Sequence, residues 1–154
     1  MKKKILALVM CVAMLCGCSN GAAEAEGELS CSIEISCEEL LEKMEKLDEA
    51  KREIVPKDGI IFYDEEVFFS EGDNAFDVLK AALDDAEIQM EYTSTVAYNS
   101  VYIEGIGNIY EGDCGDMSGW GYTVNGEFPD DGINNYILQD GDELVLNFIT
   151  SYGE

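Results

Sequence analysis

SEGDNAFDVLKAALDDA, at residues 70–86, is the stretch of this 154-residue sequence that most clearly predicts an element of the fold. Asn74 and Asp77 are three residues apart at its start, which is the spacing of a helix N-cap. The apolar positions that follow share one helical face: Phe76, Leu79, Ala82 and Leu83. This amphipathic helix must bury that face, and a sheet is the natural surface for it.

Segments with strand patterns flank the helix on both sides. Before it, Leu29–Ile35 alternates apolar and polar residues, and Ile60–Phe69 is rich in β-formers around an acidic turn, which predicts one or two short strands. After it, residues 88–93 and 100–106 also favour strands. The last segment follows an Asp-Gly turn and alternates as a strand that closes the sheet, with these apolar positions: Leu144, Leu146 and Phe148.

Two further elements are expected from local signals. Ser36 and Glu39 have capping-box spacing, and the apolar residues after them predict a helix from Cys37 to about Glu53. Asn125-Gly126 favours a two-residue type I′ turn, so 120–124 should pair with 127–128 as a hairpin. These elements predict one α+β domain, a mixed sheet packed against one or two helices.

The N-terminus predicts export. Residues 2–4 are lysines, Ile5–Leu15 is apolar but too short to span a membrane, and LCGC ends at Cys18. This box resembles the lipobox of bacterial lipoproteins, so we expect a signal peptide over 1–17 and a lipidated, palmitate-type anchor on Cys18. An ordinary secretory signal or a short membrane anchor is the alternative.

The expected localisation is therefore extracytoplasmic, at the bacterial cell membrane. Residues 18–29 are small, polar and acidic, as in a flexible tether, and residues 30–154 form the expected domain. Three cysteines follow Cys18, namely Cys31, Cys37 and Cys114, so at most one internal disulfide can form.

Composition excludes several function classes. The net charge is −24, and removal of residues 1–17 takes away three of the 9 basic residues and none of the 33 acidic ones, leaving −27. Such a charge repels nucleic acid and favours neutral or cationic partners. Histidine is absent, which removes the common catalytic triads and imidazole metal ligands. We therefore expect no enzyme, no catalytic residue and no required cofactor.

Acidic loops offer oxygen ligands but no recognised spacing. They contain the clusters Glu111, Asp113 and Asp116; Asp130 and Asp131; Asp140, Asp142 and Glu143. None has the 12-residue ligand pattern of an EF-hand, and nothing pairs two of the carboxylates as a glycosidase would require. Solvated turns explain them better, and no metal site is predicted.

Aromatic residues beside glycines are candidate ligand contacts, because such rings can grip a flat, partly apolar molecule. With one aliphatic neighbour, the candidates are Tyr98, Tyr102, Trp120, Tyr122, Phe128, Ile133 and Tyr136. Trp120 and Tyr122 fit packing of a small core equally well, and the sequence does not choose between the two roles.

Four connected motifs resemble a known family. They are VPKDGII at 55–61, GDNAFDVLKAA at 72–82, YNSVYIEGIGNIYEGDCGDMSGWGYTVNGEFP at 98–129 and GINNYILQDGDEL at 132–144. Together they are similar to bacterial extracellular domains that resemble the C-terminal domain of transcobalamin and intrinsic factor. The resemblance implies a β-grasp-like sheet packed on a helix, and cobalamin or another corrinoid as ligand. In those carriers a helical domain supplies the other half of the site, which this chain is too short to hold, so a partner or second copy would complete it.

The same resemblance implies a disulfide. Family members often carry four cysteines, in patterns like those around Cys37 and Cys114 plus a later pair that is replaced here by Ile133 and by Thr150 or its neighbour. The implied surviving bridge joins Cys37 to Cys114, with Cys31 buried as a small apolar residue.

Two functional hypotheses remain. In the first, a cell-surface lipoprotein binds a corrinoid or another small planar ligand and hands it to a membrane transporter. In the second, the module is an adhesion or interaction domain whose aromatic loops contact a second surface protein or a glycan, with no small-molecule ligand. A pocket between the 119–129 segment and the 98–107 strand would favour the first, and a flat aromatic patch the second.

Overall fold

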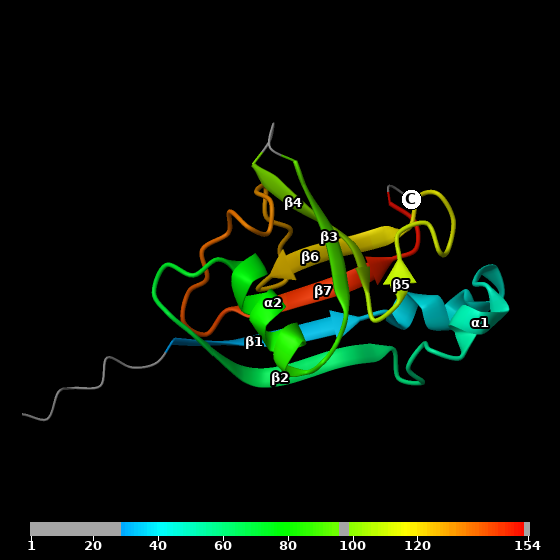
Figure 1. Cartoon of the computed structure of the whole chain (residues 1–154), viewed down its shortest axis with the longest axis horizontal. Helices are drawn as coiled ribbons and strands as arrows, with labels where there is room; N and C mark the ends of the chain where they lie inside the picture. The colour runs from blue at the N-terminus through cyan, green and yellow to red at the C-terminus, as the bar shows by residue number, and fades with distance from the viewer. Residues whose placement is uncertain (1–28, 96–98, 153–154) are drawn as a thin grey trace, which may run out of the picture.

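The computed structural model describes residues 29–95 and 99–152 (Figure 1). The elements in chain order are β1 (Leu29–Ser36), the 3₁₀ helices η1 (Glu38–Glu42) and η2 (Met44–Lys46), α1 (Glu49–Arg52), β2 (Ile60–Phe69), α2 (Ala75–Asp85), β3 (Met90–Thr95), β4 (Ser100–Ile106), β5 (Ile109–Tyr110), β6 (Gly119–Val124) and β7 (Glu143–Ile149). The predicted signal peptide, Cys18 and Tyr98 lie outside the described residues. No helix within those residues has the length and hydropathy to cross a membrane.

The strands form two sheets. The four-stranded sheet has the order β2-β1-β7-β6, and the three-stranded sheet has the order β3-β4-β5. β1 and β7 are parallel, whereas the other paired strands are antiparallel. In Figure 1, α2 and the three-stranded sheet lie on the same side of the four-stranded sheet. The predicted α+β class is confirmed.

Alternation along the two central strands builds the core. β1 and β7 place their apolar residues on one face, where the cross-strand neighbours include Ile33 with Leu144 and Ile35 with Leu146, all 0% exposed. Leu79 and Leu83 of α2 are buried in the same cluster. Because the strands contribute residues 29–36 and 143–149, burial of this face joins the two ends of the domain.

α2 forms as the sequence predicts. The Asp77 backbone N–H donates to Asn74 Oδ1 at 3.0 Å, and the Asn74 side-chain amide donates to the Asp77 carboxylate at 2.7 Å. Phe76, Leu79 and Leu83 are buried, and the Phe76 ring packs edge-to-face on Tyr92 of β3 with ring centroids 4.7 Å apart. The cap and the apolar stripe therefore agree on where this helix begins and which face it buries.

The helix predicted from Cys37 to Glu53 is wrong. The segment breaks into η1, η2 and the four-residue α1, because Lys43 and Leu47 leave helical geometry. Of the apolar positions that follow the expected cap, only Leu40 and Leu47 are buried, so no continuous stripe holds a long helix on the core. Glu39 does not cap, since its carboxylate accepts hydrogen bonds from the backbone and hydroxyl of Thr150.

The hairpin predicted at 120–128 forms only as a turn. Asn125 and Gly126 have φ angles of 53° and 80°, and one antiparallel bridge joins Val124 to Glu127. Beyond that bridge β6 pairs with β7 instead, so that Trp120 faces Phe148 and Tyr122 faces Leu146. The long-range partner buries more apolar surface than the short local arm could.

Residues 60–69, expected as one or two strands around an acidic turn, form the single strand β2. Its pairing with β1 shifts register between Cys31 and Ile33, where an extra β2 residue is accommodated. Such a bulge lets the acidic residues pass without breaking the strand. β2 is the outer strand of the sheet.

The disulfide predicted between Cys37 and Cys114 is not formed in the structure. Cys31, Cys37 and Cys114 are free and buried, at 2%, 0% and 3% exposure. A bridge needs closely opposed Cβ atoms, and a sequence resemblance does not test that geometry. Burial raises the pKa of Cys31 and of Cys37 to about 11, so these thiols are poor nucleophiles.

We expect the soluble protein from Ser19 onward to resist a thiol-specific reagent while folded and to expose three thiols when unfolded in guanidinium without reductant. Burial shields the sulfur atoms from the reagent and keeps the thiols protonated. Absorbance of the released chromophore measures the count. One reactive thiol in guanidinium, rising to three after reduction, would contradict the structure and establish the bridge instead.

Candidate functional site

An apolar cavity of about 170 Å³ lies where β4 faces β6. The two strands belong to different sheets and are in contact without pairing. The residues that line this β4–β6 cavity are Val101, Tyr102, Ile103, Trp120, Gly121, Tyr122, Gly132, Ile133 and Leu146. Four predicted ligand residues meet here, namely Tyr102, Trp120, Tyr122 and Ile133. The cavity lies between the 119–129 segment and the 98–107 strand, where a pocket favours the small-ligand hypothesis over the interaction module.

Trp120 serves the core and also lines the cavity. It is 5% exposed, its ring packs edge-to-face on Phe148 with centroids 5.3 Å apart, and its indole N–H donates to the Ile109 carbonyl at 3.0 Å. Tyr122 lies two residues further along β6, so it occupies the same face. Trp120 therefore has both of the roles that the sequence left open, because it packs in the core and also lines the cavity.

The tyrosine hydroxyls at the cavity are already hydrogen-bonded. Tyr122 donates to the Asp131 carbonyl at 2.6 Å, and Tyr102 donates to the Glu111 carboxylate at 2.5 Å. Burial raises the pKa of Tyr122 to about 12, and burial with the Glu111 hydrogen bond raises the pKa of Tyr102 to about 12. Both phenols therefore stay neutral, and the cavity offers ring surface rather than charge.

Asparagines tie the wall that contains Ile133 to the start of β4. Asn134 Oδ1 accepts from the Val101 backbone N–H at 2.8 Å, and the Asn134 side-chain amide donates to the Asn99 carbonyl at 3.0 Å. Asn135 donates to that carbonyl as well, at 2.9 Å. Ile133, directly before them, is only 3% exposed. The INN sequence therefore places one apolar side chain in the wall and fixes it with two amides.

Gly132 lies where this wall of the cavity comes close to Ser100, at the start of β4. A Cβ atom there would lie 2.5 Å from Ser100 Oγ, which is shorter than real contacts allow. A larger residue at position 132 would therefore require the Ser100 side chain to move.

The remaining predicted ligand residues do not line the cavity. Phe128 is 69% exposed. Tyr136 is partly buried, and its carbonyl accepts the Ala75 N–H at the start of α2. Val101, Ile103 and Leu146 line the cavity but were not among the predicted ligand residues, although the strand patterns around them were recognised. Which strand residues line a gap between two sheets depends on how the sheets meet, and a strand pattern does not contain that information.

Carboxylates of the acidic loops make hydrogen bonds and an ion pair within the protein. Asp113 forms an ion pair with Lys51 and accepts from the Tyr110 N–H, whereas Asp142 accepts from Asn125 and Gln139. Within residues 29–95 and 99–152, no group of three or more Cys, Asp or Glu side chains is arranged to hold a metal ion.

We expect Ile133→Ala to lower the free energy of unfolding by about 2–4 kcal/mol, because it removes a buried side chain between two closely packed elements. Ile137→Ala is the matched control, since Ile137 is 47% exposed in the same segment and should change stability by less than about 0.5 kcal/mol. Urea unfolding measures both. Equal costs would mean that Ile133 does not close the cavity wall.

Comparisons with known proteins identify the fold and the family of the chain. One solved structure similar to the chain is haptocorrin in complex with Cbi, with a TM-score of 0.57 and 14% identity over 80% of this chain. The chain spans 25% of the haptocorrin chain, and at this identity the likeness shows the fold alone. It confirms the fold expected from the resemblance to transcobalamin.

A second structure is a Ruminococcus gnavus ATCC 29149 protein described as a "putative metal binding protein", with a TM-score of 0.48 and 14% identity over 81% of this chain and 100% of that one. The search of curated proteins found no match. A family model described as a domain of unknown function matches residues 72–150, which is more than half of the sequence. The chain therefore belongs to this family, DUF4430.

Proposed function

We propose that this protein is a lipid-anchored extracytoplasmic module that holds a corrinoid, or another small planar ligand, at the β4–β6 cavity and passes it to a membrane transporter. The observation that carries the proposal is an uncharged, aromatic-lined cavity between β4 and β6, where a pocket rather than a flat patch favours a small ligand. The fold shared with a haptocorrin structure that holds Cbi supports the choice of ligand class.

The size of the cavity supports a shared site. Pockets that enclose a small ligand usually measure about 300–1,000 Å³. At about 170 Å³ the β4–β6 cavity takes one edge or one apolar substituent of a corrinoid. The remainder of the ligand would lie against a second surface, from a partner protein or a second copy of this chain.

Binding would rest on apolar contacts. The sequence contains no histidine, so no imidazole of this chain can coordinate cobalt. The tyrosine hydroxyls of the cavity are engaged within the protein, which leaves ring surface and backbone groups for a ligand. With a net charge of −24, a neutral or cationic corrinoid is favoured over an anionic one. The proposal assigns no catalytic residue.

The proposed location rests on the N-terminal sequence. Three lysines, an apolar segment and the LCGC box ending at Cys18 support lipidation of that cysteine. Acyl chains on Cys18 would keep the domain at the membrane surface, within reach of a transporter.

One observation favours the alternative, an adhesion or protein-interaction module. Tyr102, Met117 and Tyr152 are 43%, 60% and 41% exposed, and the Tyr152 N–H donates to the Met117 carbonyl at 3.0 Å. The Tyr102 hydroxyl and a ring carbon of Tyr152 both lie beside Gly119, 3.4 and 3.7 Å from the position that a Cβ atom would take there. Exposed aromatic and methionine side chains of this kind are common in protein interfaces.

We expect cobinamide to quench the fluorescence of Trp120, the one tryptophan of the sequence, because that ring lines the cavity. Val101→Phe should abolish the quenching by filling the cavity. Val145→Phe is the matched control, since its alternation with buried Leu144 and Leu146 places it on the opposite face of the sheet. A titration corrected for cobinamide absorbance measures binding. No quenching at high micromolar cobinamide would favour the interaction module.

We expect Cys18→Ser to remove the protein from the membrane fraction, because the lipid-bearing sulfur is lost. Cys16→Ser changes a neighbouring cysteine and should leave anchoring intact. Cell fractionation and intact mass measure the outcome, and the wild-type mass should equal residues 18–154 plus lipid. A wild-type protein with an unmodified Cys18 would refute the anchor.

A further inference from the structure

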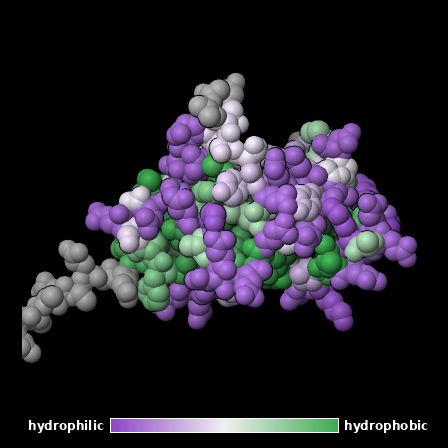
Figure 2. Space-filling model, viewed as in Figure 1, coloured by the Kyte–Doolittle hydropathy of each residue, from purple (hydrophilic) through white to green (hydrophobic). Residues whose placement is uncertain are grey.

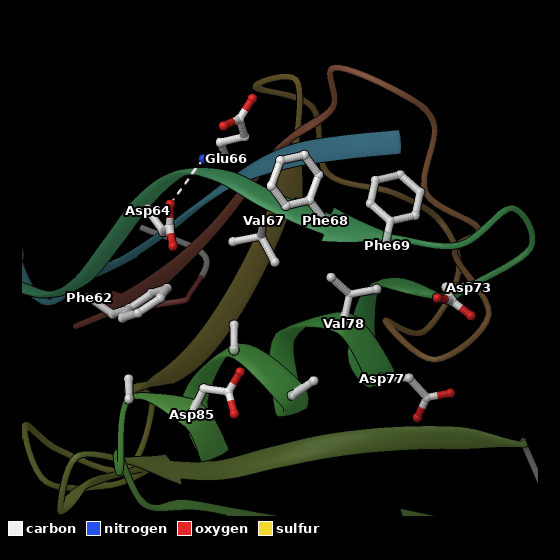
Figure 3. Close-up of a pocket in the computed structure, with 13 residues that line it drawn as sticks. Phe62, Asp64, Glu66, Val67, Phe68, Phe69, Asp73, Asp77, Val78 and Asp85 are labelled. Atoms are coloured by element: carbon white, nitrogen blue, oxygen red, sulfur yellow. Dashed lines mark hydrogen bonds between the residues drawn. The ribbon is translucent and has the colours of Figure 1, made fainter. Parts of the chain in front are cut away.

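A second apolar depression lies between β2 and α2, and it shares no lining residue with the β4–β6 cavity. Its volume is about 580 Å³. Figure 3 shows Phe62 and Val67 of β2 and Val78 of α2 directed into the space between the two elements. We name it the β2–α2 groove.

The groove exists because the core covers the apolar side chains of β2 only in part. The register opposes Phe62 to Ile35 and Val67 to Cys31, which places both β2 residues on the face that α2 covers. Yet Phe62 and Val67 stay half-buried, whereas Ile35 and Cys31 are almost fully buried. Alanines of α2 line the opposite wall and leave room above β2. The hydropathy surface in Figure 2 shows apolar surface gathered where β1 begins and β2 ends, among otherwise hydrophilic side chains.

The strand beside the groove has an open edge. β2 pairs with β1 on one side and is the outer strand of its sheet, as Figure 1 shows. Among the described residues, no strand pairs with its other side. Exposed strand edges can take up an extended segment of another chain through backbone hydrogen bonds, while side-chain pockets select its sequence.

The charges around the groove are all of one sign. Its lining includes five carboxylate residues and no lysine or arginine: Asp64, Glu66, Asp73, Asp77 and Asp85. The lysine of α2, Lys80, forms an ion pair with Asp84, which is not part of the lining. An apolar floor with an acidic rim complements a segment that carries apolar and basic side chains.

Acidic residues on an edge strand also discourage pairing with other strands. Here they make the edge selective, because they attract a basic strand and repel an acidic one. A second copy of this chain is disfavoured as occupant, since its own β2 would place Asp64, Glu65 and Glu66 against the same rim.

We propose that the β2–α2 groove binds an extended segment of a partner protein, added as a strand along the free edge of β2, in which apolar and basic residues take turns on the one face that points toward α2. The apolar side chains enter the groove over Phe62, Val67 and Val78. The basic side chains meet the carboxylates of the rim.

The test uses the mature lipidated protein in neutral detergent and a labelled lysine–valine peptide, in which lysine and valine take turns at every second position with serine between them. Binding is followed by fluorescence anisotropy. We expect saturable binding that weakens as salt is added. A lysine–serine peptide tests the apolar contacts, and a lysine–valine peptide methylated on alternate backbone nitrogens tests strand pairing. Both should bind about tenfold more weakly or not at all.

Charge reversal localises the site. The double variant Asp64→Lys with Asp85→Lys should weaken the lysine–valine peptide about tenfold, because two attractive contacts become repulsive. Asp130→Lys with Asp131→Lys is the control, since it makes the same charge change on exposed residues away from the groove. Circular dichroism checks that each variant is folded.

Several outcomes would overturn the proposal. Absence of binding would mean that the acidic edge only prevents pairing. Equal binding of the lysine–serine peptide would mean charge attraction without a groove. Equal loss in both double variants would mean that the overall charge, and not this site, attracts the peptide. None of these results bears on cobinamide binding, because the two sites are separate.

Discussion

The parallel pairing of β1 with β7 is the interaction on which the rest of the structure depends. It joins residues at the two ends of the domain and places Ile33 and Ile35 beside Leu144 and Leu146. These side chains are fully buried and form the floor on which α2 packs. A tight turn cannot join two parallel strands, so the chain between β1 and β7 must cross from one end of this strand pair to the other. Both the β4–β6 cavity and the β2–α2 groove lie where that intervening chain meets the sheet.

The sequence predicted those elements whose signals are local and agree with their burial. α2 is the clearest case, because the Asn74 cap and the apolar stripe indicate the same helix. β1 and β7 were recognised because one face is buried and the other is not, which produces a period of two. In each case the residue pattern shows which face is buried, so the element can be predicted without knowing which other element it packs against.

Elsewhere packing against distant parts of the chain, rather than the local sequence pattern, determined the structure. Asn125 and Gly126 form the expected turn, but β6 continues against β7, because that pairing buries Trp120 and partly covers Tyr122. Between residues 37 and 53 the capping signal was present without enough buried positions to sustain a helix. The candidate site was predicted only in part for a related reason. Trp120 and Ile133 were identified by residue type, whereas Val101 and Leu146 line the same cavity only because the two sheets meet there.

The two recesses differ in what can stabilise a complex. The β4–β6 cavity is small and lined by neutral groups, since both its tyrosines are hydrogen-bonded and protonated. Binding there would depend on apolar contact and would vary little with salt. The β2–α2 groove is larger and ringed by carboxylates, so complexes there would depend on charge as well as on apolar contact. Because they share no lining residue, a small ligand in the cavity and a protein segment in the groove would not compete for the same side chains. On the proposed function, that separation lets a partner be recruited through the groove without displacing a ligand from the cavity, which by itself encloses too little of a corrinoid to bind it tightly.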